Sequence, residues 1–340
     1  MRNIRRILFL GVLPLIQIGY GQGAIAQTCQ LKEMASVPIT TDAAGELIMP
    51  VTINDTQLQM IVAPGAYLGV LSPKIVQTLG LETKFIPDGM RIYGGMGEKL
   101  KQYAVAPSLK LGLEHAEQVK FLIEPDTDDQ PAAGMIGRDM LRSFDLDFDF
   151  GGGKLNLFSP DHCEGKVVYW APSYTDAPLE WSFQGYIRTK MNIDGHDFDG
   201  DLDPSAGVSY MTLTEATAIF GLTASSPGMQ AGTEDIGPQQ VQIYRYRFKS
   251  LVISGITVTN PIFEIFPDFL GDAERKEGYV PLVFKHDYSR SVTIGMDILK
   301  HLHLYVAYKE DKIYATAADA GAATAKAQAP DKPSATDTTH

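Results

Sequence analysis

The chain repeats one pattern twice, and this duplication limits the folds that it can adopt. Each copy has an alternating strand, a tight turn, a second strand and a loop of small residues. The first copy covers residues 51–66 and the second covers residues 191–206, at a constant offset of 203 − 63 = 140 positions. Such a pattern predicts a β-hairpin that leads into a loop, and this loop could present a carboxylate. The loops differ at one chemically important position, Ala63 in the first copy and Asp203 in the second.

A second shared block lies downstream of each copy, in the same half of the chain. It reads Ile-Gly-Arg-Asp-Met-Leu at residues 136–141 in the first half and Ile-Gly-Met-Asp-Ile-Leu at residues 294–299 in the second. Each block precedes another hairpin pattern. Because Asp is a favoured capping residue, we expect Asp139 and Asp297 to be the N-caps of two short helices.

Local signals within each half of the chain predict β-structure. Val and Ile recur at alternate positions and glycine-bearing turns are frequent, which indicates antiparallel strands. Two further short helices are expected, at residues 71–81 with Ser72 as N-cap and at residues 212–222 with Thr212 as N-cap. The predicted fold class is therefore all-β.

The ends of the chain do not follow the repeated pattern. Three Arg residues precede an apolar run and a small-residue cleavage box, which is the layout of a secretory signal peptide. A membrane anchor is the alternative, but the apolar run is shorter than the roughly 20 residues that a spanning helix needs. We expect a periplasmic or secreted protein with no membrane span after signal cleavage. The predicted segments are a signal peptide at 1–26, a first domain at 27–160, an interdomain segment at 161–177, a second domain at 178–315 and a disordered tail at 316–340.

The predicted export determines the expected redox state of the two cysteines. Cys29 and Cys163 are the only cysteines of the chain, and an oxidising compartment favours a disulfide between them. A catalytic thiol is the alternative, but neither cysteine lies in a recognisable partner motif.

Three ring-bearing side chains have both a structural and a functional interpretation. Trp170 lies in the interdomain segment, where we expect it to pack between the domains; a platform for a ligand is the alternative. His301 and His303 share one face of a predicted strand, but no third metal ligand can be placed beside them. We therefore expect both imidazoles to face solvent.

The charge of the chain excludes one class of partner. The formal net charge is −12, and removal of the three signal Arg residues changes it to −12 − 3 = −15. So acidic a chain repels polyphosphates, and nucleic acid is set aside as a partner. Asp199, Asp201 and Asp203 raise the alternative of a cation site, but the glycine pattern of a calcium loop is missing. We expect no metal and no cofactor.

The sequence resembles the retropepsin-like aspartic proteases, and among them the exported bacterial proteins that carry two such domains in one chain. The resemblance rests on the strand leading into each loop, the short helix, the glycine-bearing hairpin and the block at residues 136–141, and it extends from Cys29 to Ala315. It implies two tandem acid-protease β-barrel domains, each like a closed six-stranded barrel, related by a pseudo-twofold axis. The two catalytic loops would meet at that axis, and two flaps would cover an extended peptide.

The resemblance assigns a catalytic role to one position of each loop. Asp203 falls on the catalytic aspartate of the second half, and Ala63 falls on that of the first. The family needs both acids, because two neighbouring carboxylates cannot both ionise: one activates a water while the other supplies a proton. Ala63 can do neither.

The neighbouring loop positions also depart from the family. Pro64 and Pro204 stand where the family has Thr or Ser, whose hydroxyl bonds across to the partner loop, and proline has neither a hydroxyl nor a backbone N–H. The next position is Gly in the family; here it is Gly65 in the first half and Ser205 in the second. We expect all four residues to line the peptide-binding site.

A glycine-rich segment predicts a flap over that site. Tyr93, Gly94 and Gly95 open a hairpin tip whose glycines permit positive φ and close approach to a bound strand. Residues 232–237 are the counterpart in the second half. An ordinary surface hairpin is the alternative for both segments.

Two functions stay open from the sequence. The first is a monomer with an internal pseudo-dimer, which holds an extended peptide or protein segment in a groove between its domains by strand pairing. Its peptide-bond hydrolysis would be impaired or lost because Ala63 replaces the first acid. The alternative is an active aspartic endopeptidase that uses Asp203 with an unidentified second acid.

Overall fold

Strands dominate the structure. The computed structural model describes residues 30–90, 92, 94, 99–124, 132–180, 185–236, 239–267 and 292–320. We call residues up to 160 the first half, residues 161–174 the connecting segment and residues from 175 the second half. The strands of the first half are β1 (Glu33–Pro38), β2 (Thr40–Thr41), β3 (Leu47–Ile53), β4 (Thr56–Val62), β5 (Val70–Leu71), β6 (Glu82–Phe85), β7 (Gln102–Leu111), β8 (Glu114–Ile123), β9 (Gly134–Ile136), β10 (Asp145–Asp149) and β11 (Lys154–Phe158). Those of the second half are β12 (Thr175–Pro178), β13 (Ile187–Ile193), β14 (His196–Leu202), β15 (Tyr210–Thr212), β16 (Gln230–Ile236), β17 (Gln239–Arg247), β18 (Ser250–Ile253), β19 (Ile256–Thr259), β20 (Ile262–Phe266), β21 (Val292–Ile294), β22 (Leu302–Ala307) and β23 (Lys312–Ala317).

The described helices are short. They are α1 (Pro73–Thr78), α2 (Arg138–Leu141), α3 (Leu213–Phe220), α5 (Met296–Leu299) and the 3-10 helix η2 (Tyr308–Glu310). The sequence signals for α1 and α3 are confirmed: Ser72 and Thr212 are the N-caps, and each accepts a hydrogen bond from a backbone N–H of the first turn. No described helix is long and apolar enough to cross a membrane.

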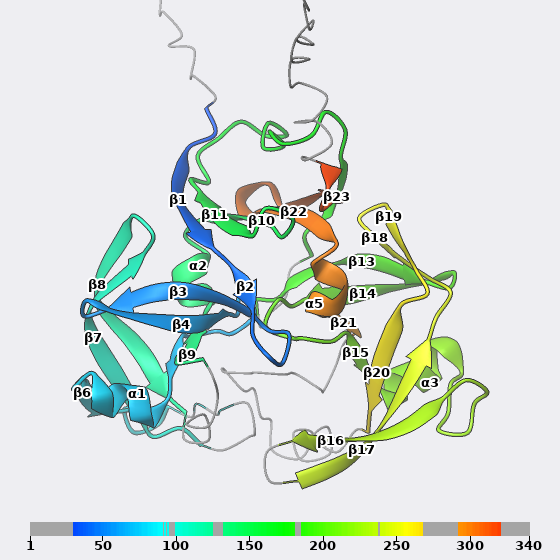
Figure 1. Ribbon diagram of the computed structural model, residues 1–340, viewed down its shortest axis with the longest axis horizontal. Helices are drawn as coiled ribbons and strands as arrows, with labels where there is room; N and C mark the ends of the chain where they lie inside the picture. The colour runs from blue at the N-terminus through cyan, green and yellow to red at the C-terminus, as the bar shows by residue number, and fades with distance from the viewer. Residues whose placement is uncertain are drawn as a thin grey trace, which may run out of the picture.

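The strands form three sheets, and the prediction of an all-β, retropepsin-like fold is confirmed. In the first half, eight strands follow the order β2-β3-β4-β9-β5-β8-β7-β6, and a further β3–β7 pairing closes the strands from β3 to β7 of this order into a barrel. In the second half, nine strands follow the order β16-β17-β20-β15-β21-β14-β13-β18-β19. Figure 1 shows these two sheets on opposite sides of the molecule.

The third sheet takes strands from both halves. Its order is β1-β11-β10-β22-β23-β12, so three strands come from the first half and three from the second. The halves join where β10 pairs with β22, with Leu146 opposite Val306 and Phe148 opposite Leu304. Figure 1 shows this sheet at the top, bridging the other two. Strand β23 continues to Ala317, beyond the predicted end of the second domain at residue 315.

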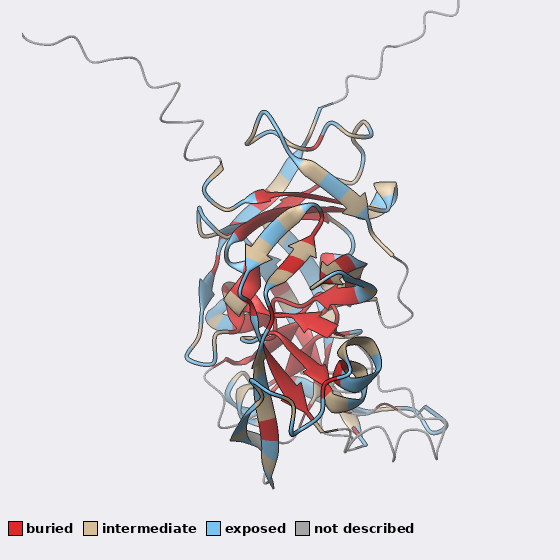
Figure 2. Cartoon of the chain, turned by 90° about the vertical axis from the view of Figure 1, so that its right-hand side faces the viewer, coloured by how far each residue is buried: buried red, intermediate tan, exposed pale blue. Residues whose placement is uncertain are grey.

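Alternation along the strands explains the cores. In β3, Leu47, Met49, Val51 and Ile53 are buried and the residues between them are half-buried. β13 also buries every second residue, with Lys190 exposed between them, as expected for strands whose successive side chains point to opposite faces. Figure 2 shows the buried residues concentrated in the strands at the centre of the molecule.

The connecting segment covers the outer face of the shared sheet. The indole Nε1 of Trp170 donates a 2.9 Å hydrogen bond to Thr316 Oγ1 in β23, so the packing interpretation of Trp170 is confirmed. Beneath it, His303 is only 4% exposed, and its Nε2 lies 2.7 Å from a carboxylate oxygen of Asp147. The prediction that His303 faces solvent is therefore wrong, whereas His301 is exposed as expected.

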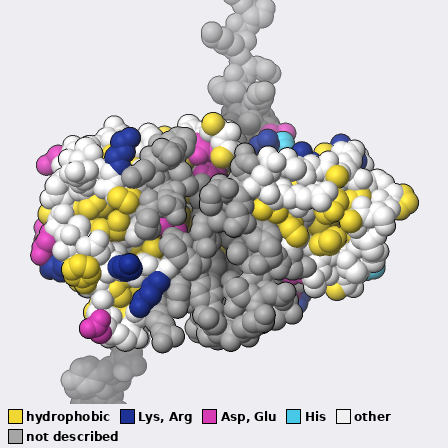
Figure 3. Space-filling model, turned by 90° about the horizontal axis from the view of Figure 1, so that it is seen from below, with side chains coloured by type: hydrophobic (Ala, Val, Ile, Leu, Met, Phe, Trp, Pro, Cys, Tyr) yellow, Lys and Arg dark blue, Asp and Glu magenta, His cyan; other side chains and the backbone are white. Residues whose placement is uncertain are grey.

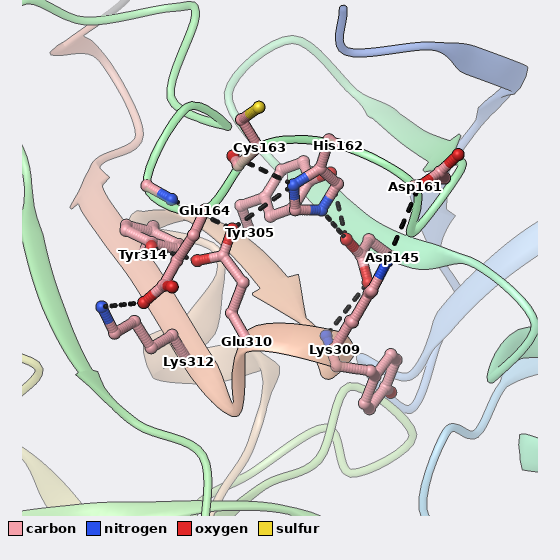
Figure 4. Close-up of polar contacts among 12 residues, drawn as sticks. Asp145, Asp161, His162, Cys163, Glu164, Tyr305, Lys309, Glu310, Lys312 and Tyr314 are labelled. Carbon is pink, nitrogen blue, oxygen red and sulfur yellow. Dashed lines mark hydrogen bonds and ion pairs between the residues drawn. The ribbon is translucent and has the colours of Figure 1, made fainter. Parts of the chain in front are cut away.

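A second buried histidine–carboxylate pair attaches the connecting segment to the shared sheet. Figure 4 shows the imidazole of His162 between Asp145 on one side and Glu310 on the other. His162 Nε2 lies 2.5 Å from Asp145 Oδ2, and its Nδ1 lies 3.3 Å from Glu310 Oε1. Burial raises the pKa of Asp145, and the hydrogen bond from His162 opposes this shift. Tyr314 also donates its hydroxyl to Glu310.

Several sequence predictions fall on residues outside the described ones. These are the signal peptide at residues 1–26, Cys29 and the part of the tail from residue 321 onward. The disulfide between Cys29 and Cys163 therefore stays a prediction.

Candidate functional site

Both loops of the sequence repeat begin at the same point of the same strand arrangement. In the first half, β4 runs parallel to β9, and β5 lies antiparallel on the other side of β9. In the second half, β14, β21 and β15 repeat these pairings. Residues 63–66 follow β4 directly, and residues 203–206 follow β14.

Ala63 and Asp203 have equivalent backbone positions. The N–H of Ala63 donates to the carbonyl of Ile136 at 3.0 Å, and the N–H of Asp203 donates to the carbonyl of Ile294 at 3.0 Å. The residue three positions further on closes a turn onto each of them, through N–H···O bonds of 3.0 and 3.1 Å. The backbone thus aligns the two positions that the sequence repeat aligned.

The carboxylate of Asp203 is buried and hydrogen-bonded within its own loop. Its residue exposure is 6%. Asp203 Oδ1 accepts hydrogen bonds from the backbone N–H of Ser205 at 2.9 Å and from its hydroxyl at 2.6 Å. Both bonds stabilise negative charge on this oxygen. Ser205, which departs from the family glycine, therefore orients the acid.

Ala63 offers only a methyl group. It is 1% exposed and belongs to an apolar cluster. The first loop thus places a buried methyl group where the second places an acid. The other buried members are Ile61, Ala66, Val70, Ile92, Leu100, Leu122, Ala132 and Met135.

Each loop contacts the opposite half. The carbonyl of Pro204 accepts a 2.9 Å hydrogen bond from the N–H of Leu47, at the start of β3. Gly65 packs against the ring of Tyr186, so closely that a Cβ atom at residue 65 would lie 2.4 Å from Cδ1 of the ring. Only glycine fits there. Both loops therefore lie at the seam between the halves, where Pro64 is also buried.

Two glycine turns cross the seam in the same way. Gly45 has φ +84° and Gly185 has φ +86°, at the repeat offset of 185 − 45 = 140. Gly45 lies against Gly207, and Gly185 lies against the guanidinium of Arg138. Left-handed backbone favours glycine. At both positions the absence of a side chain also lets the backbone lie close to the opposite half.

Exposed apolar side chains lie beside both loops. Tyr67 follows the first loop and is 42% exposed, and Val208 lies just after the second and is 41% exposed. The guanidinium of Arg138 lies over the Tyr67 ring, 4.6 Å from its centroid. Figure 3 shows hydrophobic side chains on both flanks of the face seen from below.

Asp139 and Asp297 are not helix N-caps, which corrects the sequence prediction. Gly137 and Gly295 hold that position, without a side-chain bond. Asp139 Oδ1 instead accepts the N–H of Gly69 at 3.1 Å, and Asp297 Oδ1 accepts the hydroxyl of the nearby Ser209 at 2.7 Å. Desolvation raises the pKa of Asp139 to about 6 and raises that of Asp297. Each acid thereby anchors the segment that follows a loop.

The other acids near Asp203 have partners of their own. Asp201 receives two hydrogen bonds from Arg188, Nε to Oδ1 at 2.7 Å and Nη2 to Oδ2 at 2.8 Å. Such a fork-shaped pairing is the strong form of this interaction. Asp199 bonds to Lys190 at 3.0 Å. Among the described residues, no group of three or more His, Cys, Asp or Glu is arranged to hold a metal ion.

The flap predictions are only partly covered by the structure. Tyr93 and Gly95 lie outside the described residues, and Gly94 is buried. In the second half, the predicted segment at residues 232–237 coincides with the hairpin of β16 and β17, of which residues 237 and 238 are not described. The role of these segments as flaps stays a prediction.

Sequence reasoning missed the residues that cross the seam. Tyr186 and Arg138 fill space against the opposite half, and Leu47 bonds to it through its backbone. One available signal was the pair Gly45 and Gly185 at the repeat offset, since paired glycines outside a hairpin turn indicate close backbone approach.

The first half is similar to a known protease family. Residues 49–143 match the family of gag-polyprotein putative aspartyl proteases. The matched range contains Ala63, so the half that shows this similarity is the half without the acid. No curated protein matches the chain.

Proposed function

We propose that this protein binds an extended peptide segment in a groove between its halves and does not hydrolyse it. One observation carries the proposal: Ala63 and Asp203 make the same backbone hydrogen bonds, yet only Asp203 has a carboxylate. The similarity of residues 49–143 to aspartyl proteases supplies the class of ligand.

The chemistry of a single acid supports loss of hydrolysis. An aspartic protease needs one carboxylate as base and one carboxylic acid as proton donor, and the splitting of their pKa values arises because the two charges are neighbours. The position equivalent to Asp203 is Ala63, which has no carboxyl group to serve as the second acid. Because Pro64 and Pro204 have no hydroxyl, the cross-loop bond of the family is also lost.

Peptide binding does not need the acids. An extended peptide gains affinity from main-chain hydrogen bonds and specificity from pockets for alternate side chains. The exposed Tyr67 and Val208, one beside each loop, offer apolar contact to such side chains. The proposal includes a periplasmic or secreted, monomeric protein whose first half and connecting segment are linked by the predicted disulfide.

A second candidate function is an aspartic endopeptidase that recruits another acid. The position of Glu46 favours this function. Glu46 is only 3% exposed, and the N–H of the next residue, Leu47, donates to the carbonyl of Pro204. Glu46 would then supply the proton that Ala63 cannot.

One experiment separates the two functions. Mature protein is incubated with a fluorescein-labelled synthetic peptide library between about pH 3 and pH 7; binding is read by anisotropy and cleavage by mass spectrometry. Wild type is compared with Asp203→Asn, Glu46→Gln and the surface control Asp55→Asn. We expect binding without cleavage in wild type, and binding that persists in Asp203→Asn.

Two results contradict the proposal. Cleavage by wild type that disappears in both Asp203→Asn and Glu46→Gln, but not in Asp55→Asn, would establish the endopeptidase. Absence of any binding across the library would reject the peptide-binding groove itself.

A further inference from the structure

A cavity of about 550 Å³ lies on the second half, at a place that the seam does not reach. It opens between β12 and the β13–β14 hairpin, with the end of β18 at one side. None of its lining residues belongs to either loop of the candidate site. It is therefore a separate feature of the molecule.

A larger side chain fills the corresponding place in the first half. β1 contacts β3 as β12 contacts β13, and Val37 of β1 corresponds to Ala177 of β12 by the repeat offset, 177 − 37 = 140. Val37 is 2% exposed and packs against Gly112, where an added Cβ would lie 3.4 Å from its Cγ2. Ala177 is smaller and only half-buried. The loss of the two Val methyl groups opens the space.

Ser254 lines this cavity, and its side chain carries a buried hydroxyl. It corresponds to Gly112, because each follows the last residue of the strand that pairs with β3 or β13. Gly112 has φ +59° and Ser254 has φ +46°, a left-handed conformation that disfavours any side chain with a Cβ. Ser254 is 5% exposed, and its Oγ has no hydrogen-bond partner among the described residues. The position combines backbone strain with an unsatisfied buried hydroxyl, a combination that points to function.

Acids surround the opening. Asp176, Asp197 and Asp199 line the cavity, against a single cation, Lys190. The Lys190 ammonium is already bonded to Asp199 at 3.0 Å. The corresponding first-half residues carry no charge: they are Ser36, Gln57 and Gln59. The acidic rim is thus specific to the half that has the cavity.

The remaining wall of the cavity is apolar. Met191, Phe198 and Val252 contribute to the lining. A ligand that matches both parts carries a positive charge on a chain of methylene groups, as many sites combine apolar walls with a few polar groups that orient the ligand. We propose that this cavity binds a free aliphatic amine through its ammonium group, with Ser254 Oγ as one acceptor and the carboxylates of the rim as the others.

Calorimetric titration of the mature protein tests the proposal. The probe is 1,5-diaminopentane, and the uncharged analogue of equal length is 1,5-pentanediol. We expect saturable binding of the diamine at one site, weaker binding at high salt because the rim charges are screened, and no binding of the diol. The third compound is Nα-acetyl-lysine amide, which has the free side-chain ammonium group of a lysine in a peptide. Binding of this compound without binding of the diamine would reject a free amine in favour of a peptide lysine.

Variants taken from the first half locate the site. Ser254→Gly removes the hydroxyl and relaxes the backbone, and Ala177→Val refills the space; we expect each to weaken diamine binding by about tenfold or more. Ser254→Gly should not lower the melting temperature, so loss of binding cannot be ascribed to unfolding. Asp197→Asn with Asp199→Asn should weaken binding equally.

A matched control completes the design. Asp55→Asn removes one carboxylate from the corresponding hairpin of the first half, where Asp55 pairs with Lys110 at the surface, and should leave the affinity unchanged. Absence of saturable diamine binding, or equal affinity in wild type, Ser254→Gly and Ala177→Val, would overturn the proposal.

Discussion

The indole of Trp170 lies flat on the imidazole of His303, with ring centroids 3.9 Å apart and planes inclined by 1°. The imidazole in turn bonds to Asp147 of β10 at 2.7 Å. Connecting segment, first half and second half therefore meet at one stack of side chains. The stack accounts for a buried carboxylate that would otherwise be unfavourable in a sheet.

Trp170→Ala should destabilise the protein by about 2–4 kcal/mol, because it removes the aromatic packing on His303 and the hydrogen bond to Thr316. Urea unfolding monitored by circular dichroism measures the change. Leu113→Ala, at a site 90% exposed, should change the free energy of unfolding by less than about 0.5 kcal/mol. Equal effects of the two substitutions would show that the stack contributes nothing.

Ala63→Asp should lower stability without creating activity. The new carboxylate would lie in an apolar cluster, at an expected loss of about 3–5 kcal/mol near neutral pH. Since burial raises the pKa of a carboxyl group, the loss should shrink on acidification. Ala63→Asn introduces a side chain of nearly the same size and shape without the charge, so the difference between the two variants measures the effect of the charge. Thermal unfolding at two pH values and a peptide-cleavage assay measure both effects, and Asp203-dependent cleavage by this single variant would refute the prediction.

A combined variant should restore hydrolysis. Ala63→Asp with Pro64→Thr, Pro204→Thr and Ser205→Gly returns both acids and the cross-loop hydroxyls, the arrangement that splits the two pKa values. We expect cleavage of the peptide library with an acidic optimum. The same variant carrying Asp203→Asn is the inactive control, and an inactive but folded combined variant would contradict the assignment of these positions.

The stability of the protein should depend on Asp139 between about pH 4 and pH 6. Desolvation raises the folded-state pKa of this carboxyl from 3.8 to about 6. Within this window the unfolded chain ionises while the folded protein keeps its proton, so the contribution of Asp139 is present below the window and is lost as pH rises through it. Unfolding free energies of Asp139→Asn should fall less steeply with pH than those of wild type. Asp55→Asn should follow wild type, and parallel profiles for Asp139→Asn and wild type would contradict the assignment.

Cys29 and Cys163 should form a disulfide in exported protein. Thiol labelling under denaturing, non-reducing conditions should then detect no free thiol. Cys163→Ala should lower the free energy of unfolding by about 2–5 kcal/mol. Reduced wild type provides the labelling control, and two free thiols in exported protein would reject the bond.

Sequence alone predicted the features that depend on neighbouring residues. The hairpins before Ala63 and Asp203 follow from alternation, and α1 and α3 begin at Ser72 and Thr212 because a capping hydroxyl acts within one helical turn. The equivalence of Ala63 and Asp203 also followed, since a repeated sequence repeats its local backbone.

Distant partners explain the failures. Asp139 looked like a cap, but its carboxylate bonds to Gly69, which is 70 positions away. His303 looked exposed because nothing near it in the sequence covers it; its cover, Trp170, arrives from the connecting segment. The shared sheet was missed for the same reason, as the pairing of β10 with β22 places Leu146 opposite Val306, 306 − 146 = 160 positions away. No periodicity within a strand reports such contacts.

The sheet built jointly by the two halves has a genetic consequence. In an assembly of two identical chains, every substitution appears twice, so an acid lost from one site is lost from both. Here the partner halves are covalently continuous and always meet as an unlike pair through β10 and β22. A single codon change can therefore set the side chain at residue 63 and leave Asp203 in place, or set the side chain at residue 177 and leave Val37 in place.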